Sequence, residues 1–161
     1  MMTPLDALLR GAETHPNHVA FIADGTIWSY RRFATEIERT ARAMAARGVR
    51  PGDRVALHMA NVPAMAIACY ACFRIGAIAA PLNNRFKTVE LRSLLQRLQP
   101  SLYLGQAHLY PQVEPEILPA EARFVVGGAT GDVMVNSCPM VHGSGLFTFL
   151  TGIHHGTPHR S

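Results

Sequence analysis

The order of hydrophobic and polar residues changes its period several times along the chain. Asp24-Gly25 separates two short apolar runs, which predicts a hairpin with a tight turn at positive φ. After Ser29, a suitable helix cap, apolar residues recur at steps of three and four, which predicts an amphipathic helix that ends at Gly48. The apolar face of this helix consists of Phe33, Ile37, Ala41, Met44 and Ala45.

The middle of the chain continues the alternation of strand and helix. Residues 51–53, Pro-Gly-Asp, predict a turn before a strand at residues 55–57. Asn61 is then a suitable cap for an apolar helix, and Gly76 suits the left-handed position that stops it. Residues 77–81 predict a short buried strand.

A third helix and two more strands complete the pattern. Thr88 predicts the cap of a helix through Leu98, and strands are predicted at residues 101–104 and 122–126. The stretch 107–117 between them has an ambiguous helical pattern, because two prolines interrupt it. Strands that alternate with crossover helices predict an α/β fold, a mostly parallel sheet with helices on both faces.

Composition narrows the classes of protein that this chain can represent. The formal charge is +4 and the pI is near 9.3, but the arginines are scattered from Arg10 to Arg160, so a nucleic-acid partner is not expected. Arg74 interrupts the apolar run 62–82, which is typical of a core helix and not of a membrane span. Three cysteines and no cleavable hydrophobic leader after Met1 predict a cytoplasmic protein.

Candidate cofactor motifs are incomplete. Residues 127–131, Gly-Gly-Ala-Thr-Gly, follow a predicted strand as a dinucleotide-binding loop would, but the full glycine pattern of that fingerprint, the helix start and the ribose-binding acid are missing. A plain connecting loop is therefore preferred, with dinucleotide binding as the weaker alternative. A Walker-type loop is excluded because Lys87, the only lysine, is far from any glycine run.

No metal site is predicted. Cys69 and Cys72 have redox or zinc spacing, but they lie in an apolar helical run without a second ligand pair, so we interpret them as core residues. His155 and His159 have the spacing of two ligands on one helical face, but Pro158 between them and the basic composition argue against a helix there.

Three segments together resemble the amino-terminal part of adenylate-forming (AMP-binding) acyl-CoA synthetases. They are Trp-Ser-Tyr-Arg-Arg-Phe at residues 28–33, the Gly-x-x-x-Gly-Asp-x-Val pattern within residues 48–56, and the Gly-Ala-x-x-x-Pro-Leu-Asn pattern within residues 74–83, with Glu90 at the expected distance after it. Their order and spacing agree over most of residues 3–126. The resemblance implies that residues 1–126 form an amino-terminal α/β subdomain of that family.

Residues 127–161 resemble a different part of the same family. Pro139 to Leu146 is similar to the Pro-Met-Phe-His-x-x-Gly segment that helps line the acyl pocket, so the resemblance implies His142 and Gly143 as substrate-binding positions. A packed or solvated loop histidine is the alternative for His142. The stretch that carries the family's Thr-Ser-Gly-Thr-Thr-Gly-x-Pro-Lys phosphate loop is missing between the two regions, and a basic, histidine-rich tail follows the pocket segment.

The resemblance implies ATP, Mg²⁺ and CoA as cofactors and a small carboxylic acid or fatty acid as substrate. The family joins acid and thiol through an acyl-adenylate, which requires neutralisation of phosphate charge. Without the phosphate loop and the carboxyl-terminal catalytic lysine, we expect a truncated relative with no catalytic residues, no tightly bound cofactor and no adenylation alone. The alternative is a non-catalytic interaction module. In either case we expect self-association through exposed apolar surface at Phe147, Phe149, Leu150 and Ile153.

Overall fold

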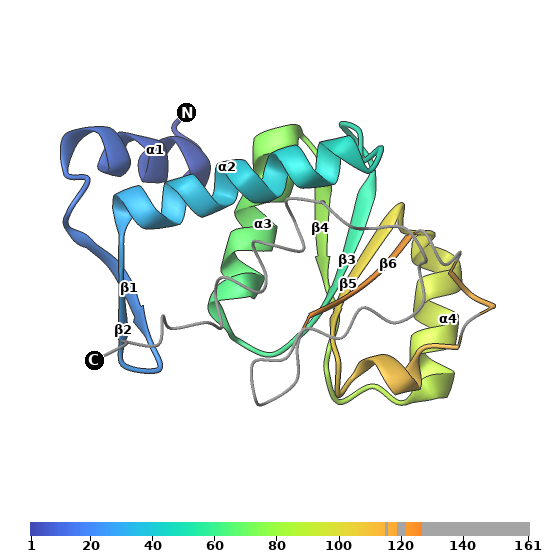
Figure 1. Ribbon diagram of the computed structural model, residues 1–161. Helices are drawn as coiled ribbons and strands as arrows, with labels where there is room; N and C mark the ends of the chain where they lie inside the picture. The colour runs from blue at the N-terminus through green and yellow to red at the C-terminus, as the bar shows by residue number, and fades with distance from the viewer. Residues whose placement is uncertain (115, 119–121, 127–161) are drawn as a thin grey trace.

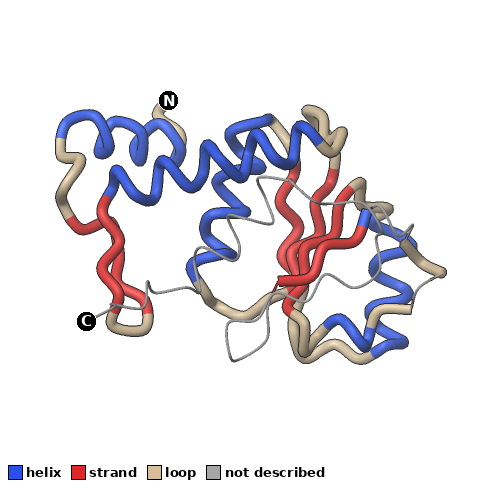
Figure 2. The backbone as a smooth tube through the Cα atoms, viewed as in Figure 1, coloured by secondary structure: helices blue, strands red, loops and turns tan. Residues whose placement is uncertain are grey.

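Apart from one β-hairpin, helices and strands alternate along residues 1–114, 116–118 and 122–126, which are the residues that this computed structural model describes (Figure 1). The elements in chain order are α1 (Pro4–Thr14), β1 (Val19–Ala23), β2 (Thr26–Ser29), α2 (Tyr30–Ala46), β3 (Arg54–His58), α3 (Pro63–Ile75), β4 (Ile78–Pro81), α4 (Thr88–Leu98), β5 (Leu102–Gln106), the 3-10 turn η1 (Tyr110–Gln112) and β6 (Arg123–Val126). Within the described residues, β4-β3-β5-β6 form a fully parallel sheet, and β1-β2 form a separate antiparallel hairpin (Figure 2).

The parallel sheet is covered on both faces. Successive side chains of a strand point to opposite faces. Val55 and Leu57 of β3 therefore join the core formed with α1, α2 and α3, whereas Ala56 joins the core formed with α4. In Figure 1, α2 and α3 lie on one side of the sheet and α4 lies on the other. The predicted α/β class, with helices on both faces of a parallel sheet, is confirmed.

The turn, cap and helix-end signals around α2 are confirmed, whereas Ala45, assigned to the apolar face of this helix, is exposed. Asp24 and Gly25 have φ of 48° and 73°, as a tight hairpin turn between right-twisted strands requires. The Ser29 hydroxyl accepts a hydrogen bond from the Arg32 N–H at 3.2 Å and so caps the first turn of α2. Gly48, just past the end of the helix, has φ of 88°.

Two predicted caps are wrong. Asn61 does not cap α3, because Pro63 occupies the first helical position, where its missing N–H and fixed φ favour the start of a helix, and no side chain caps the turn. Thr88 is the first residue of α4, and Lys87 precedes it as the cap residue. The Lys87 N–H donates to Glu90 Oε2 at 2.7 Å, so the glutamate reaching back sets the start of this helix.

Two further predictions about segments are corrected. The strand predicted as buried, β4, is an edge strand with β3 as its one neighbour among the described strands, and Ile78 is 52% exposed. The ambiguous stretch 107–117 forms one 3-10 turn, η1, within its described residues, since its prolines prevent a longer helix.

The apolar run at residues 62–82 supplies the core and not a longer helix. It contains α3, which is 13 residues long, and then turns at Gly76 into β4. Among the described residues, no helix combines the length and hydropathy needed to cross a bilayer.

Candidate functional site

The order of the strands marks one position at the carboxyl-terminal end of the parallel sheet. The connection from β3 through α3 leads to β4 on one side of β3, whereas the connection through α4 leads to β5 on the other side. The winding direction therefore changes between β3 and β5. In open parallel α/β sheets, ligands bind beyond the carboxyl ends of the strands at such a switch point. The carboxyl ends of β3 and β5 are the candidate functional site.

A buried polar pair occupies this position. His58 is the last residue of β3, and its Nδ1 lies 2.8 Å from the hydroxyl oxygen of Tyr103 on β5. Both side chains are 0% exposed. The two rings meet edge to face, with centroids 5.9 Å apart and planes inclined at 64°. The pair therefore joins the two strands on the face that α4 covers.

Gly105 makes room for this pair. It lies opposite His58 in the parallel register and two residues after Tyr103, so all three lie on the same face of the sheet. A Cβ atom at Gly105 would be 2.5 Å from Cε1 and Cζ of Tyr103 and closer still to the hydroxyl oxygen. The tyrosine ring thus lies directly over the glycine, which lets its hydroxyl reach the end of β3.

The electrostatic environment keeps both groups neutral. Burial, with a smaller contribution from His108, lowers the pKa of His58 to about 4, and burial followed by the influence of Tyr110 raises the pKa of Tyr103. With the Tyr103 O–H donating to Nδ1, Nε2 of His58 carries the proton, and this atom is buried with no hydrogen-bond partner among the described residues. If Nδ1 of His58 donated to the Tyr103 oxygen instead, the Tyr103 O–H would also lack a partner. Donation from Tyr103 to Nδ1 is therefore favoured.

A second contact joins the loops at the same edge. The Gln106 side-chain oxygen, at the end of β5, accepts a hydrogen bond from the Ala60 N–H, two residues after β3, at 2.7 Å. Within the described residues, no group of three His, Cys, Asp or Glu side chains could hold a metal ion. The edge therefore offers neutral hydrogen-bonding groups, and its described residues hold no metal-binding cluster.

The site residues predicted from sequence are not among the residues that the structure describes. His142 and Gly143 fall outside the described residues, as do residues 127–131 and the histidines at 155 and 159. Sequence reasoning did not single out His58 and Tyr103. A histidine closing an apolar strand and a Tyr-x-Gly spacing in a later strand were the available signals, and neither of them indicates pairing by itself.

The two cysteines of α3 pack into the core. Cys72 is buried and Cys69 is half-buried against the same cluster. Burial raises the pKa of both thiols, that of Cys72 to about 12 with a smaller contribution from Cys69. Because thiolates are the reactive form, neither thiol has the environment of a redox centre.

We expect slow native labelling of both cysteines by a thiol reagent. In a Cys138→Ser background, Cys72 should react more slowly than Cys69, because it is the more deeply buried, and both should react quickly in denaturant. Mass spectrometry of peptides after timed labelling measures each rate. Fast labelling of Cys72 in the native protein would contradict its assignment to the core.

Comparisons with known proteins show similarity to AMP-binding enzymes and to parts of several CoA ligases. The family model described as AMP-binding enzyme matches residues 8–126. Crotonobetaine/carnitine–CoA ligase from Salmonella typhimurium is 40% identical over 84 residues, and that from Citrobacter koseri is 34% identical over 112 residues. These matches cover 52% and 66% of this chain but span only 16% and 22% of the relatives' length.

Solved structures agree with this similarity. The o-succinylbenzoate CoA synthetase of Bacillus subtilis is 26% identical with a TM-score of 0.61, and the match covers 68% of this chain and 28% of that one. A benzoate CoA ligase from Burkholderia xenovorans, 20% identical, shares the fold with a TM-score of 0.70, covering 92% of this chain and 28% of that one.

Proposed function

Because the chain belongs to the AMP-binding enzyme family, we propose that it supplies the amino-terminal α/β part of an ATP-dependent acid–thiol ligase. The observation that carries the proposal is the family match over residues 8–126. Relatives named as CoA ligases support the reaction class, in which a carboxylic acid is joined to CoA. The proposed substrate is a small carboxylic acid or a fatty acid, and the proposed location is the cytoplasm.

The described residues do not fit ATP and Mg²⁺. Adenylation develops negative charge on phosphate oxygens, which cations must neutralise. The candidate site at the ends of β3 and β5 offers the neutral groups of His58, Tyr103 and Gln106 instead. The only lysine, Lys87, is the cap residue of α4. The role proposed for these residues is to fix the ends of the strands on which the larger enzyme is built.

We expect no acid-dependent exchange of pyrophosphate into ATP by the purified 161-residue chain. The reason is that its sequence contains no phosphate loop and no second lysine. The measurement is incorporation of labelled pyrophosphate into ATP with a panel of carboxylic acids, with the Salmonella relative as positive control. Exchange well above the no-acid background would show that the chain adenylates by itself.

A chimera tests the proposed function directly. Residues 8–126 would replace the matching region of the Salmonella crotonobetaine/carnitine–CoA ligase, and CoA thioester formation would be measured. We expect activity within about tenfold of the parent, equivalent to about 1.4 kcal/mol of transition-state stabilisation. A chimera carrying Leu57→Asp, which places a charge in the core, is the inactive control. A folded chimera that forms no thioester would contradict the proposal.

An interaction module derived from the same family is the alternative function. Ile22 and Ile27 lie directly opposite each other on the β1-β2 hairpin and are 64% and 59% exposed. Exposed apolar pairs on a two-stranded sheet favour contact with another surface. An active chimera with intact kinetics would favour the ligase over the module.

A further inference from the structure

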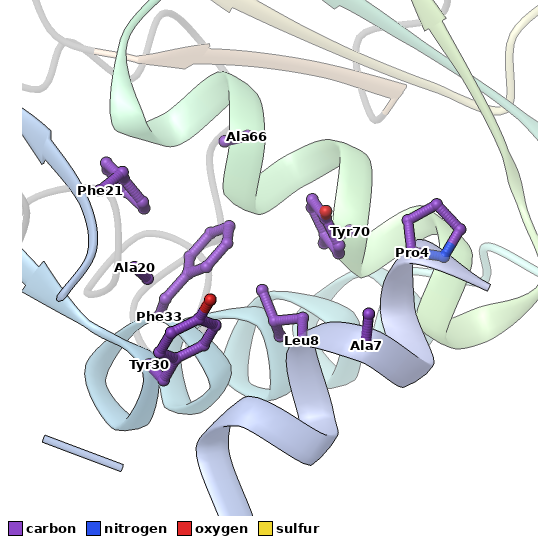
Figure 3. Close-up of a pocket in the computed structure, with 9 residues that line it drawn as sticks. All are labelled: Pro4, Ala7, Leu8, Ala20, Phe21, Tyr30, Phe33, Ala66 and Tyr70. Carbon is purple, nitrogen blue, oxygen red and sulfur yellow. The ribbon is translucent and has the colours of Figure 1, made fainter. Parts of the chain in front are cut away.

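A cavity lies apart from the strand ends described above, and its lining includes none of His58, Tyr103 and Gln106. It has a volume of about 490 Å³ and is open to the surface between α1, β1, α2 and α3 (Figure 3). Its described lining residues are Pro4, Ala7, Leu8, Ala20, Phe21, Tyr30, Phe33, Ala66 and Tyr70. We call this cavity the aromatic groove. Its volume is within the range typical of small-molecule sites, about 300–1,000 Å³.

Aromatic rings fix the walls of the groove. Phe33 meets Phe21 edge to face at 5.0 Å between centroids and meets Tyr70 in the same way at 5.4 Å. Tyr30 lies against the backbone of α1, because a Cβ at Gly11 would be 2.7 Å from its ring. Figure 3 shows the rings of Tyr30, Phe33 and Tyr70 around the same space. The walls come from separate elements whose packing holds them in place.

The chemistry of the lining restricts the ligand. None of the nine described lining residues is charged, so a buried carboxylate or phosphate would lack a counter-charge and would lose hydration without compensation. The hydroxyls of Tyr30 and Tyr70 make no hydrogen bond to another described residue and can bond to a polar atom of a ligand. Aromatic faces and edges favour a flat ring.

We propose that the aromatic groove binds a neutral aromatic small molecule that carries one hydrogen-bonding group. The acid, ATP and CoA of the proposed function are all anionic, so this site is separate from theirs and does not depend on that function. A ring packs into the cavity against the aromatic side chains that line it, and its polar atom bonds to a tyrosine hydroxyl. The buried apolar area provides most of the affinity.

Trp28 provides a natural reporter of occupancy. It is the only tryptophan, and its ring stacks on Phe21 with centroids 5.4 Å apart and planes inclined at 11°. A ligand ring beside Phe21 changes the magnetic environment of this stack. The indole N–H signal of Trp28 and the amide signal of Ala66 therefore report binding from two different walls.

The test compares two probes that share a ring system but differ in charge. The 161-residue chain would be titrated with 2-naphthol, which is neutral, and with 2-naphthoate, which is anionic, and followed by ¹H–¹⁵N NMR. We expect saturable shifts at Trp28 and Ala66 with 2-naphthol and at least tenfold weaker binding of 2-naphthoate. Absence of saturable shifts with 2-naphthol, or equal or tighter binding of 2-naphthoate, would overturn the proposal.

Three variants locate the binding. Ala66→Phe fills the groove from α3. Ala7→Leu adds a smaller side chain from α1, at a position where the alanine is exposed. Both should reduce 2-naphthol affinity by at least tenfold, whereas Ala45→Phe, on the exposed part of α2 and outside the lining, should leave it unchanged. If Ala66→Phe does not fold, the 2-naphthol affinity of Ala7→Leu tests the location of the site. Unchanged affinity in a folded groove-filling variant would place the binding elsewhere and refute the assignment.

Discussion

Replacing Gly105 with alanine is expected to lower the free energy of unfolding by about 2–4 kcal/mol. The new Cβ would lie 2.5 Å from two ring atoms of Tyr103 and closer still to the hydroxyl oxygen, far inside normal contact. The ring cannot retreat easily, because Tyr103 is 0% exposed under α4. Moving it would also break the hydrogen bond to His58 and leave two buried polar groups unpaired.

Urea denaturation followed by circular dichroism measures this effect. Gly48→Ala is the matched control, since a Cβ there meets nothing within 4 Å and suffers only from a φ of 88°, for which we expect a loss of about 1 kcal/mol. In a Tyr103→Phe background, which lacks the nearest clashing atom, Gly105→Ala should cost about 1 kcal/mol less. A loss no greater than that of Gly48→Ala would show that Gly105 is not a packing requirement.

Acidification from pH 7.5 to pH 5 is expected to cost the wild-type protein about 2 kcal/mol through His58 alone. Burial lowers the pKa of this histidine from 6.5 to about 4 in the folded state. As the pH falls below 6.5, His58 binds a proton in the unfolded chain but stays neutral in the folded chain. Stability is therefore lost between pH 6.5 and pH 4. Well above pH 6.5 the group is neutral in both states and contributes no pH dependence.

The groups that surround His58 support this direction. Tyr103 is hydrogen-bonded to Nδ1, and among the described residues His108 is the other titratable group that influences the imidazole; neither is a carboxylate that would stabilise the protonated form. His58→Gln keeps a polar side chain but removes the titration. The difference in unfolding free energy between wild type and variant, measured at pH 7.5, 6 and 5, isolates the contribution of His58. A difference that stays constant with pH would contradict the lowered pKa.

Part of the site depended on contacts that no local pattern encodes. His58 and Tyr103 are 45 residues apart in sequence, and only the parallel pairing of β3 with β5 brings their side chains together. The aromatic groove likewise draws its walls from four elements, and the apolar residues in them look like ordinary core positions in sequence. Meanwhile, the residues that the resemblance singled out, His142 and Gly143, lie outside the described part of the chain.

The sequence by itself determined the local features of the fold, which depend on residues close together in the chain. The turn at Asp24-Gly25, the cap at Ser29 and the end of α3 at Gly76 follow from backbone φ and from hydrogen bonds within a few residues, and the motif order identified the family. Tertiary structure decided that β4 lies at the edge and which side chains meet across strands. Those outcomes depend on the order of strands in the sheet, because burial and long-range hydrogen bonds are set by which strands become neighbours.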